Sequence, residues 1–129
     1  MASFLAKPLI HIVDDDDAVR DSLDVYLTLK GMSVIAFGSA RELLDHEDGL
    51  PHLFILDVNM PEIDGFTLLE TLRDRGHVAP AILITGLGDP DMRMRAERAG
   101  AAALFDKPLD PAVLFSTLLQ LLAERPASI

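Results

Sequence analysis

Short apolar runs alternate with helical patterns about five times along this chain. The runs are residues 9–13 (LIHIV), 32–37 (MSVIAF), 53–58 (LFILDV), 81–85 (AILIT) and 101–105 (AAALF). Apolar residues at helical spacing follow each run, which predicts a helix after every strand. Strands that alternate with helices form βαβ units, so we expect a doubly wound α/β fold with one parallel five-stranded sheet and five helices.

Residues that favour helix ends mark the boundaries of these helices. Ser39 and Glu42 have the spacing of a capping box at the start of the second helix. Asp-Pro pairs at residues 89–90 and 110–111 predict an N-cap followed by proline at the first helical position. We expect the last helix to run to about Arg125. The first helix should bury one stripe and end at Gly31, and the stripe consists of Val19, Leu23, Tyr26, Leu27 and Leu29.

Length and composition limit the classes of protein to consider. The 129 residues suit one domain, which we place at residues 9–125, with short tails at 1–8 and 126–129. The net charge of −10 argues against direct nucleic-acid binding, and the absence of cysteine excludes disulfides and thiolate sites. No apolar run is long enough to span a membrane, and no signal peptide is recognisable, so we expect a cytoplasmic protein.

Polar residues stand at the end of four of the predicted strands. Four aspartates, Asp14 to Asp17, follow the first strand, and Asp57 lies at the end of the third. Thr85 ends the fourth strand, and Lys107 follows the fifth. Ligands of open α/β sheets bind at the carboxyl ends of the strands, so these side chains should share one edge.

This combination of side chains suits phosphoryl chemistry. Carboxylates packed together cannot all ionise cheaply, so either the pKa of one of them rises or a cation lies among them. Oxygen ligands favour a hard ion such as Mg²⁺. Lys107 would add a positive charge, and the Thr85 hydroxyl could donate to a phosphoryl oxygen. An aspartate can take a phosphoryl group as an acyl phosphate, and Asp57, at the end of the most buried strand, is our candidate nucleophile.

Each feature alone has a structural explanation. The acidic run could cap the first helix, Thr85 could be an ordinary strand residue, and Lys107 could be a solvated lysine. Their joint occurrence at four strand ends favours a site. The four histidines have no site spacing, and we expect His11 to be packed within its strand.

At this point the chain resembles the receiver domain of two-component response regulators, over residues from Leu9 to about Ala123. The resemblance rests on the aspartate pair after the first strand, LDVNMPEIDG around the third, ITG at the fourth and FDKP at the fifth. It implies a flavodoxin-like sheet of order 2-1-3-4-5. The GLGDPDM stretch is similar to that of receivers joined to helix-turn-helix output domains.

The resemblance implies a role for each matching residue. Asp57 would be phosphorylated by a sensor histidine kinase or a histidine phosphotransfer protein. Mg²⁺ would be held by Asp15 and Asp57 directly, by Asp14 through water, and by the backbone carbonyl of Asn59. Thr85 and Lys107 would hold phosphoryl oxygens, and the Lys107–Pro108 peptide would be cis. Asn59 and Leu87 match the positions that tune the lifetime of the phosphoryl group.

One position departs from the family pattern. Family members usually carry an aromatic switch residue three positions before the lysine, where this chain has Leu104 followed by Phe105. Leucine has no ring to move inward, so the way in which a signal reaches the surface of the fourth and fifth strands is open.

Two other functions compete with a phospho-acceptor switch. Asp15, Asp17 and Val19 form a D-x-D-x-V pattern similar to the nucleophile motif of haloacid dehalogenase phosphatases, although the later acidic pair and the room for a cap domain are lacking. The second competing function is a receiver-like docking module that no longer takes phosphate, and only Leu104 supports it. We expect no enzyme activity beyond the chain's own phosphorylation and dephosphorylation. The sequence does not identify the downstream target, and a homodimer is compatible with it.

Overall fold

The strands and helices alternate along the whole described chain. The computed structural model describes residues 7–46, 49–86 and 90–124. The strands are β1 (Leu9–Val13), β2 (Ser33–Phe37), β3 (Leu53–Asp57), β4 (Ala81–Thr85) and β5 (Ala103–Asp106). The helices are α1 (Asp17–Leu29), α2 (Ala40–Asp45), α3 (Gly65–Asp74), α4 (Pro90–Ala99) and α5 (Pro111–Ala123).

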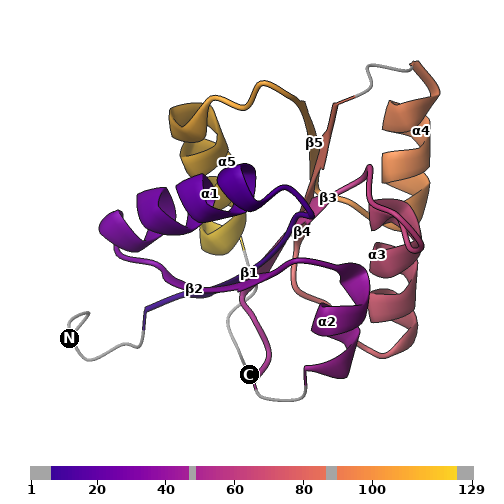
Figure 1. Cartoon of the computed structure of the whole chain (residues 1–129), viewed down its shortest axis with the longest axis horizontal. Coiled ribbons are helices and arrows are strands. Elements are labelled where there is room, and N and C mark those ends of the chain that lie inside the picture. Colours follow the sequence, from indigo (N-terminus) through magenta and orange to yellow (C-terminus); the bar gives the residue numbers. More distant parts are fainter. Residues whose placement is uncertain (1–6, 47–48, 87–89, 125–129) are drawn as a thin grey trace.

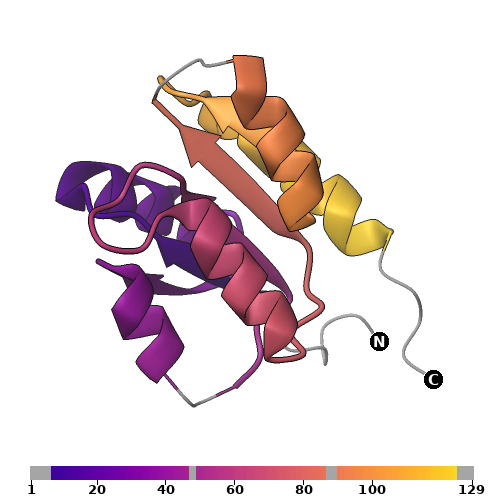
Figure 2. The same ribbon diagram turned by 90° about the vertical axis from the view of Figure 1, so that its right-hand side faces the viewer.

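The five strands form one parallel sheet in the order β2-β1-β3-β4-β5, which confirms the predicted fold class and strand order. Helices α1 and α5 cover one face, and α2, α3 and α4 cover the other (Figures 1 and 2). Because all strands run in one direction, their carboxyl ends lie along one edge of the sheet. That edge is where the polar strand-end residues meet.

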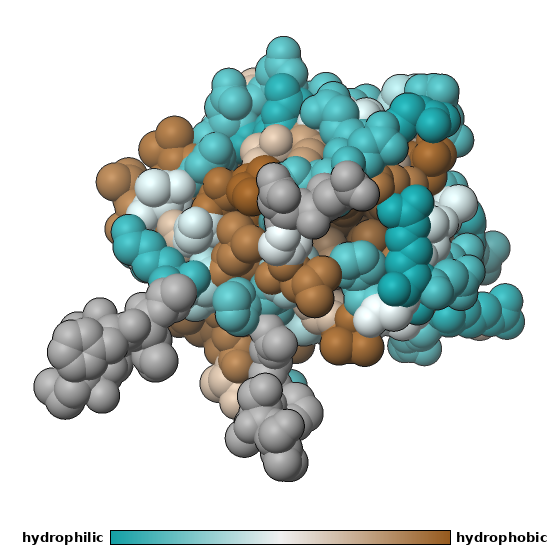
Figure 3. All heavy atoms as spheres, turned by 90° about the horizontal axis from the view of Figure 1, so that it is seen from below, coloured by the Kyte–Doolittle hydropathy of each residue, from teal (hydrophilic) through white to brown (hydrophobic). Residues whose placement is uncertain are grey.

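Each face of the sheet has its own core. Ile10 and Ile12 point towards α1 and α5, whereas Phe54 and Leu56 point towards the other three helices. Every residue of β3 and of β4 is buried, as expected for central strands covered on both faces. Other apolar side chains remain at the surface, and the face seen from below has hydrophobic residues at its centre with hydrophilic ones around them (Figure 3).

Side-chain caps begin the helices. The Asp16 carboxylate accepts from the backbone N–H of Ala18 at 2.9 Å, so part of the acidic run caps α1. Ser39 Oγ accepts from the N–H of Glu42 at 3.1 Å, as the capping box predicts. Asp110 caps α5 through the N–H of Ala112. The expected cap at Asp89 lies outside the described residues.

Some predicted details were wrong, whereas the ends of two helices lie close to their predicted positions. Leu29 is 80% exposed, because it lies about 200° around the helix from the buried Leu27 and so faces solvent. Helix α1 is closed by Gly31 as predicted, since Lys30 is its C-cap and Gly31 follows with a φ of +93°. Strand β5 begins at Ala103, the residue that pairs with Ile82, and not at residue 101 as predicted. Helix α5 runs to Ala123 with Glu124 as its C-cap, close to the predicted end at about Arg125, which lies outside the described residues.

The His11 ring is buried in an aromatic cluster on the face covered by α2, α3 and α4. It is 2% exposed, and neither ring nitrogen has a hydrogen-bond partner among the described residues. Its ring centroid lies 5.3 Å from that of Phe37 and 5.5 Å from that of His46. Burial, with smaller contributions from His46 and His77, lowers the pKa of His11 from 6.5 to about 4. The expected packing of His11 within its strand is confirmed.

We predict that His11 makes the fold sensitive to acid. As the pH falls below 6.5, the unfolded chain takes up the His11 proton and the folded chain does not, so the free energy of unfolding drops by up to about 3 kcal/mol by pH 4. Urea unfolding of the parent and of His11→Leu between pH 4 and 8 measures this term. The parent should lose more stability than the variant in acid, and equal losses would contradict the prediction.

Candidate functional site

The carboxyl edge of the sheet brings the predicted site residues together. Asp14 follows β1, Asp57 ends β3, Thr85 ends β4, and Lys107 follows β5. Carboxylate oxygens of Asp14, Asp15 and Asp57 all lie within 4.8 Å of one another. Lys107 Nζ lies 3.5 Å from Asp14 Oδ2 and 3.7 Å from Asp57 Oδ2. Two of the three carboxylates, Asp14 and Asp57, therefore share one ammonium.

Asp14 is held by bonds to both its backbone and its side chain. Arg20 Nη1 donates to the Asp14 carbonyl at 2.7 Å, and the backbone N–H of Asp16 donates to Asp14 Oδ1 at 2.9 Å. The second carboxylate oxygen, Oδ2, is buried and has the Lys107 ammonium at 3.5 Å as its ion-pair partner, but it makes no hydrogen bond within the described residues. An oxygen with this environment is suited to a ligand that the protein itself does not supply.

Asp57 is fixed by the loop that follows it. The backbone N–H of Asn59 donates to Asp57 Oδ1 at 3.2 Å. The start of α3 packs against the same residue, because a Cβ on Gly65 would lie 2.5 Å from the Asp57 carbonyl oxygen. Only glycine allows so close an approach, and the position of α3 is thereby tied to that of Asp57.

Burial and charge oppose the ionisation of Asp57. Burial first, and then the negative charge of Asp14, raise the pKa of Asp57 to about 7, although Lys107 acts in the opposite direction. A divalent cation would relieve this repulsion. The donor set consists of carboxylate oxygens, without histidine or cysteine, and therefore fits a hard ion such as Mg²⁺.

Two contributions of the sequence to this site were not predicted. Arg20 reaches the Asp14 carbonyl from the first turns of α1, and its place after the acidic run was the only available signal. The Asn59 side chain was also missed, since only its backbone carbonyl was considered. Its Oδ1 accepts from Thr85 Oγ1 at 3.0 Å and from the N–H of Gly86 at 2.9 Å. Leu87 lies outside the described residues.

The residues around the switch position lie on opposite faces. Leu104 is half-buried against the core beneath α2, α3 and α4, whereas Phe105 packs into the core beneath α1 and α5. The Phe105 ring therefore cannot replace an aromatic residue at position 104. The Lys107–Pro108 peptide that follows is cis.

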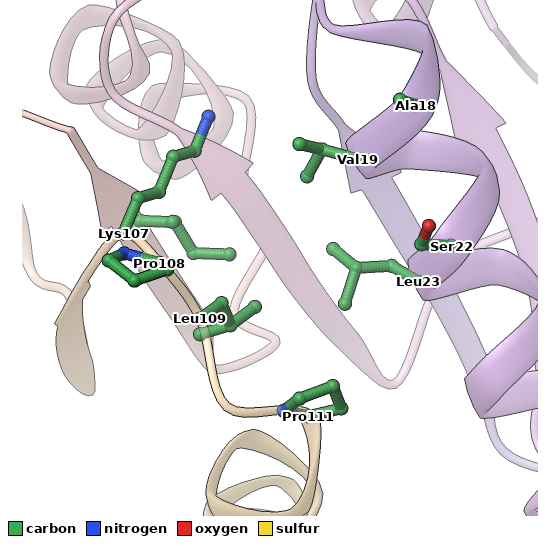
Figure 4. Close-up of a pocket in the computed structure, with 9 residues that line it drawn as sticks. Ala18, Val19, Ser22, Leu23, Lys107, Pro108, Leu109 and Pro111 are labelled. Atoms are coloured by element: carbon green, nitrogen blue, oxygen red, sulfur yellow. The ribbon is translucent and has the colours of Figure 1, made fainter.

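A cavity of about 380 Å³ adjoins the acidic site between α1 and the segment from Lys107 to Pro111. Figure 4 shows Val19 and Leu23 on one side and Pro108 and Leu109 on the other, with the Lys107 ammonium extending away from the apolar lining. The cavity is lined mostly by apolar side chains, so the charged chemistry is confined to its rim.

Sequence comparisons identify response regulators among the relatives of this chain. The chain is 38% identical over 112 residues to the transcriptional regulatory protein FixJ of Azorhizobium caulinodans, covering 84% of this chain and 52% of that protein. It is 40% identical over 101 residues to the response regulator protein TodT of Pseudomonas putida, covering 78% and 44%. The chain thus spans about half the length of these curated relatives.

Solved structures show the same fold. A CheY-like receiver domain protein from Methanospirillum hungatei matches with a TM-score of 0.85 at 30% identity, over 92% of this chain and 95% of that one. The crystal structure of FixJ-N matches with a TM-score of 0.81 at 33% identity, over 96% of this chain and 100% of that one.

Two further observations concern membrane spanning and family membership. Within the described residues, no helix is long and apolar enough to cross a membrane. The model of the response regulator receiver domain family matches residues 10–119, most of the chain, which favours a receiver over the haloacid dehalogenase family. The chain belongs to the response regulator receiver domains of two-component systems.

Proposed function

We propose that this receiver is a switch phosphorylated on Asp57 with Mg²⁺, in a histidine-to-aspartate phosphorelay. The observation that carries the proposal is the cluster of three carboxylates within 4.8 Å, beside a single lysine. The phosphoryl donor would be a sensor histidine kinase or a histidine phosphotransfer protein. The chain would catalyse only its own phosphorylation and dephosphorylation, in the cytoplasm.

Mg²⁺ would be held by Asp14, Asp15, Asp57 and the backbone carbonyl of Asn59. When bound, it would draw negative charge from the phosphoryl oxygens. The buried Asp14 Oδ2 supports this proposal, because it makes no hydrogen bond within the described residues and has only the more distant Lys107 ammonium, at 3.5 Å, to offset its charge.

The chain's own groups would carry out the transfer. A carboxylate oxygen of Asp57 attacks phosphorus, the bond from phosphorus to the histidine nitrogen breaks, and the leaving imidazole takes up a proton. The product is an acyl phosphate. Lys107, already within 3.7 Å of Asp57, would pair with a phosphoryl oxygen, and Thr85 would donate its hydroxyl to another.

A receiver-like docking module that no longer takes phosphate is the second candidate, and Leu104 is the observation that favours it. The complete acidic cluster argues for the switch instead, because Lys107 alone does not offset the cost of burying Asp14 and Asp57 as charged groups. The relatives are about twice as long as this chain. The proposal therefore names no downstream target and no oligomeric state.

We predict that Asp57→Asn abolishes phosphorylation without harming the fold. With acetyl phosphate and Mg²⁺, intact mass should show one phosphoryl adduct on the parent and none on the variant. Without metal at pH 8, the variant should unfold with a free energy at least equal to that of the parent, because it removes a charge from the cluster.

The matched control for this experiment is Asp74→Asn, which alters an exposed aspartate at the end of α3 and should label as the parent does. Labelling of Asp57→Asn to the level of the parent would show that the acceptor lies elsewhere.

We also predict that Mg²⁺ binding competes with protons. Because the metal binds the ionised form of Asp57, whose pKa is about 7, the apparent affinity should rise about tenfold between pH 6 and pH 8. Calorimetric titration with Mg²⁺ in two buffers of different ionisation enthalpy measures both the affinity and the released protons. An affinity independent of pH, with no proton release, would contradict the prediction.

A further inference from the structure

The side chain of Asn59 joins the acceptor loop to the end of β4. Its Oδ1 accepts from Thr85 Oγ1 at 3.0 Å and from the N–H of Gly86 at 2.9 Å. Its own backbone N–H donates to Asp57 Oδ1. One residue therefore contacts both the proposed acceptor and the proposed phosphoryl-binding hydroxyl.

The orientation of the Asn59 amide follows from its partners. A backbone N–H can only donate, so the atom that faces Gly86 must be the amide oxygen and not the nitrogen. The same oxygen faces the Thr85 hydroxyl, so in this contact the hydroxyl must be the donor. The single hydroxyl proton of Thr85 is thus directed at Asn59.

We propose that the Asn59 side chain is a latch that holds Thr85 in the unphosphorylated arrangement and competes with the phosphoryl group for its hydroxyl proton. The inference rests on the proposed phosphorylation of Asp57. Asn59 is a positioning residue, since it acts through Thr85.

Phosphorylation would exchange one partner of Thr85 for another. Thr85 is fully buried, so its hydroxyl is shielded from water and must pass from Asn59 Oδ1 to a phosphoryl oxygen. The Gly86 N–H donates to the same Oδ1, so a change of partner at this oxygen reaches the backbone at the end of β4. The end of β4 is thereby coupled to Asp57 without an aromatic ring at position 104.

The test uses beryllofluoride with Mg²⁺ as a phosphoryl analogue that binds at equilibrium. Binding to the parent, Asn59→Ala, Thr85→Ala and the double variant is measured by calorimetry, and the Gly86 amide resonance is followed by NMR. Removing the latch should tighten binding about fivefold. In the Thr85→Ala background the gain should largely disappear, because the competition acts through the hydroxyl.

The amide spectrum separates this role from a merely structural one. In unliganded Asn59→Ala, the Gly86 amide should shift towards its position in the loaded parent. Suppose that the parent binds beryllofluoride but Asn59→Ala binds it no more tightly, or that Asn59→Ala tightens binding equally in the Thr85→Ala background. The latch is then wrong, and the proposed function stands. If the parent fails to bind, the proposed function fails and the latch with it.

Discussion

The burial of Asp14 and Asp57 side by side, with one lysine between them, is the constraint on which this structure depends. Both carboxylates are almost fully removed from solvent, and the rise in the pKa of Asp57 expresses the cost of ionising them together. A fold gains nothing in stability from such a pair, since apolar residues of similar size would pack there without repulsion. The arrangement is understandable when a cation and a phosphoryl group are its ligands.

The rest of the fold keeps these groups in place. Parallel strands bring four strand ends to one edge, and the fully buried β3 gives Asp57 a rigid support. Gly65 lets α3 begin directly against the Asp57 backbone, and Arg20 ties α1 to the Asp14 carbonyl. A displacement of either helix would therefore be felt at the carboxylates.

Much of this could be predicted because it depends on local pattern. The apolar runs identify the strands, and the strand-end rule then places Asp57, Thr85 and Lys107 at one edge. Caps such as Ser39 and Asp110 depend on neighbours in sequence and were found in the same way. Leu29 was misplaced because its angle around the helix, and not its hydrophobicity, decides its exposure.

Two of the unpredicted contacts join residues far apart in sequence. The Asn59 amide meets Thr85 across 26 positions, and the His11 ring meets His46 only after β1 and α2 pack together. Periodicity carries no information on such side-chain orientations. The Asn59 contact gives this chain, in which Leu104 occupies the switch position, a side-chain connection from the loop after Asp57 to the end of β4.

The central claim is that Asp57 itself becomes the acyl phosphate. The most direct measurement is borohydride reduction of the protein after treatment with acetyl phosphate and Mg²⁺, followed by peptide mass mapping. An acyl phosphate is reduced to an alcohol, so the account predicts homoserine at position 57 in the treated protein and aspartate there when Mg²⁺ is withheld. Homoserine at position 15, or at no position in a folded protein, would contradict it.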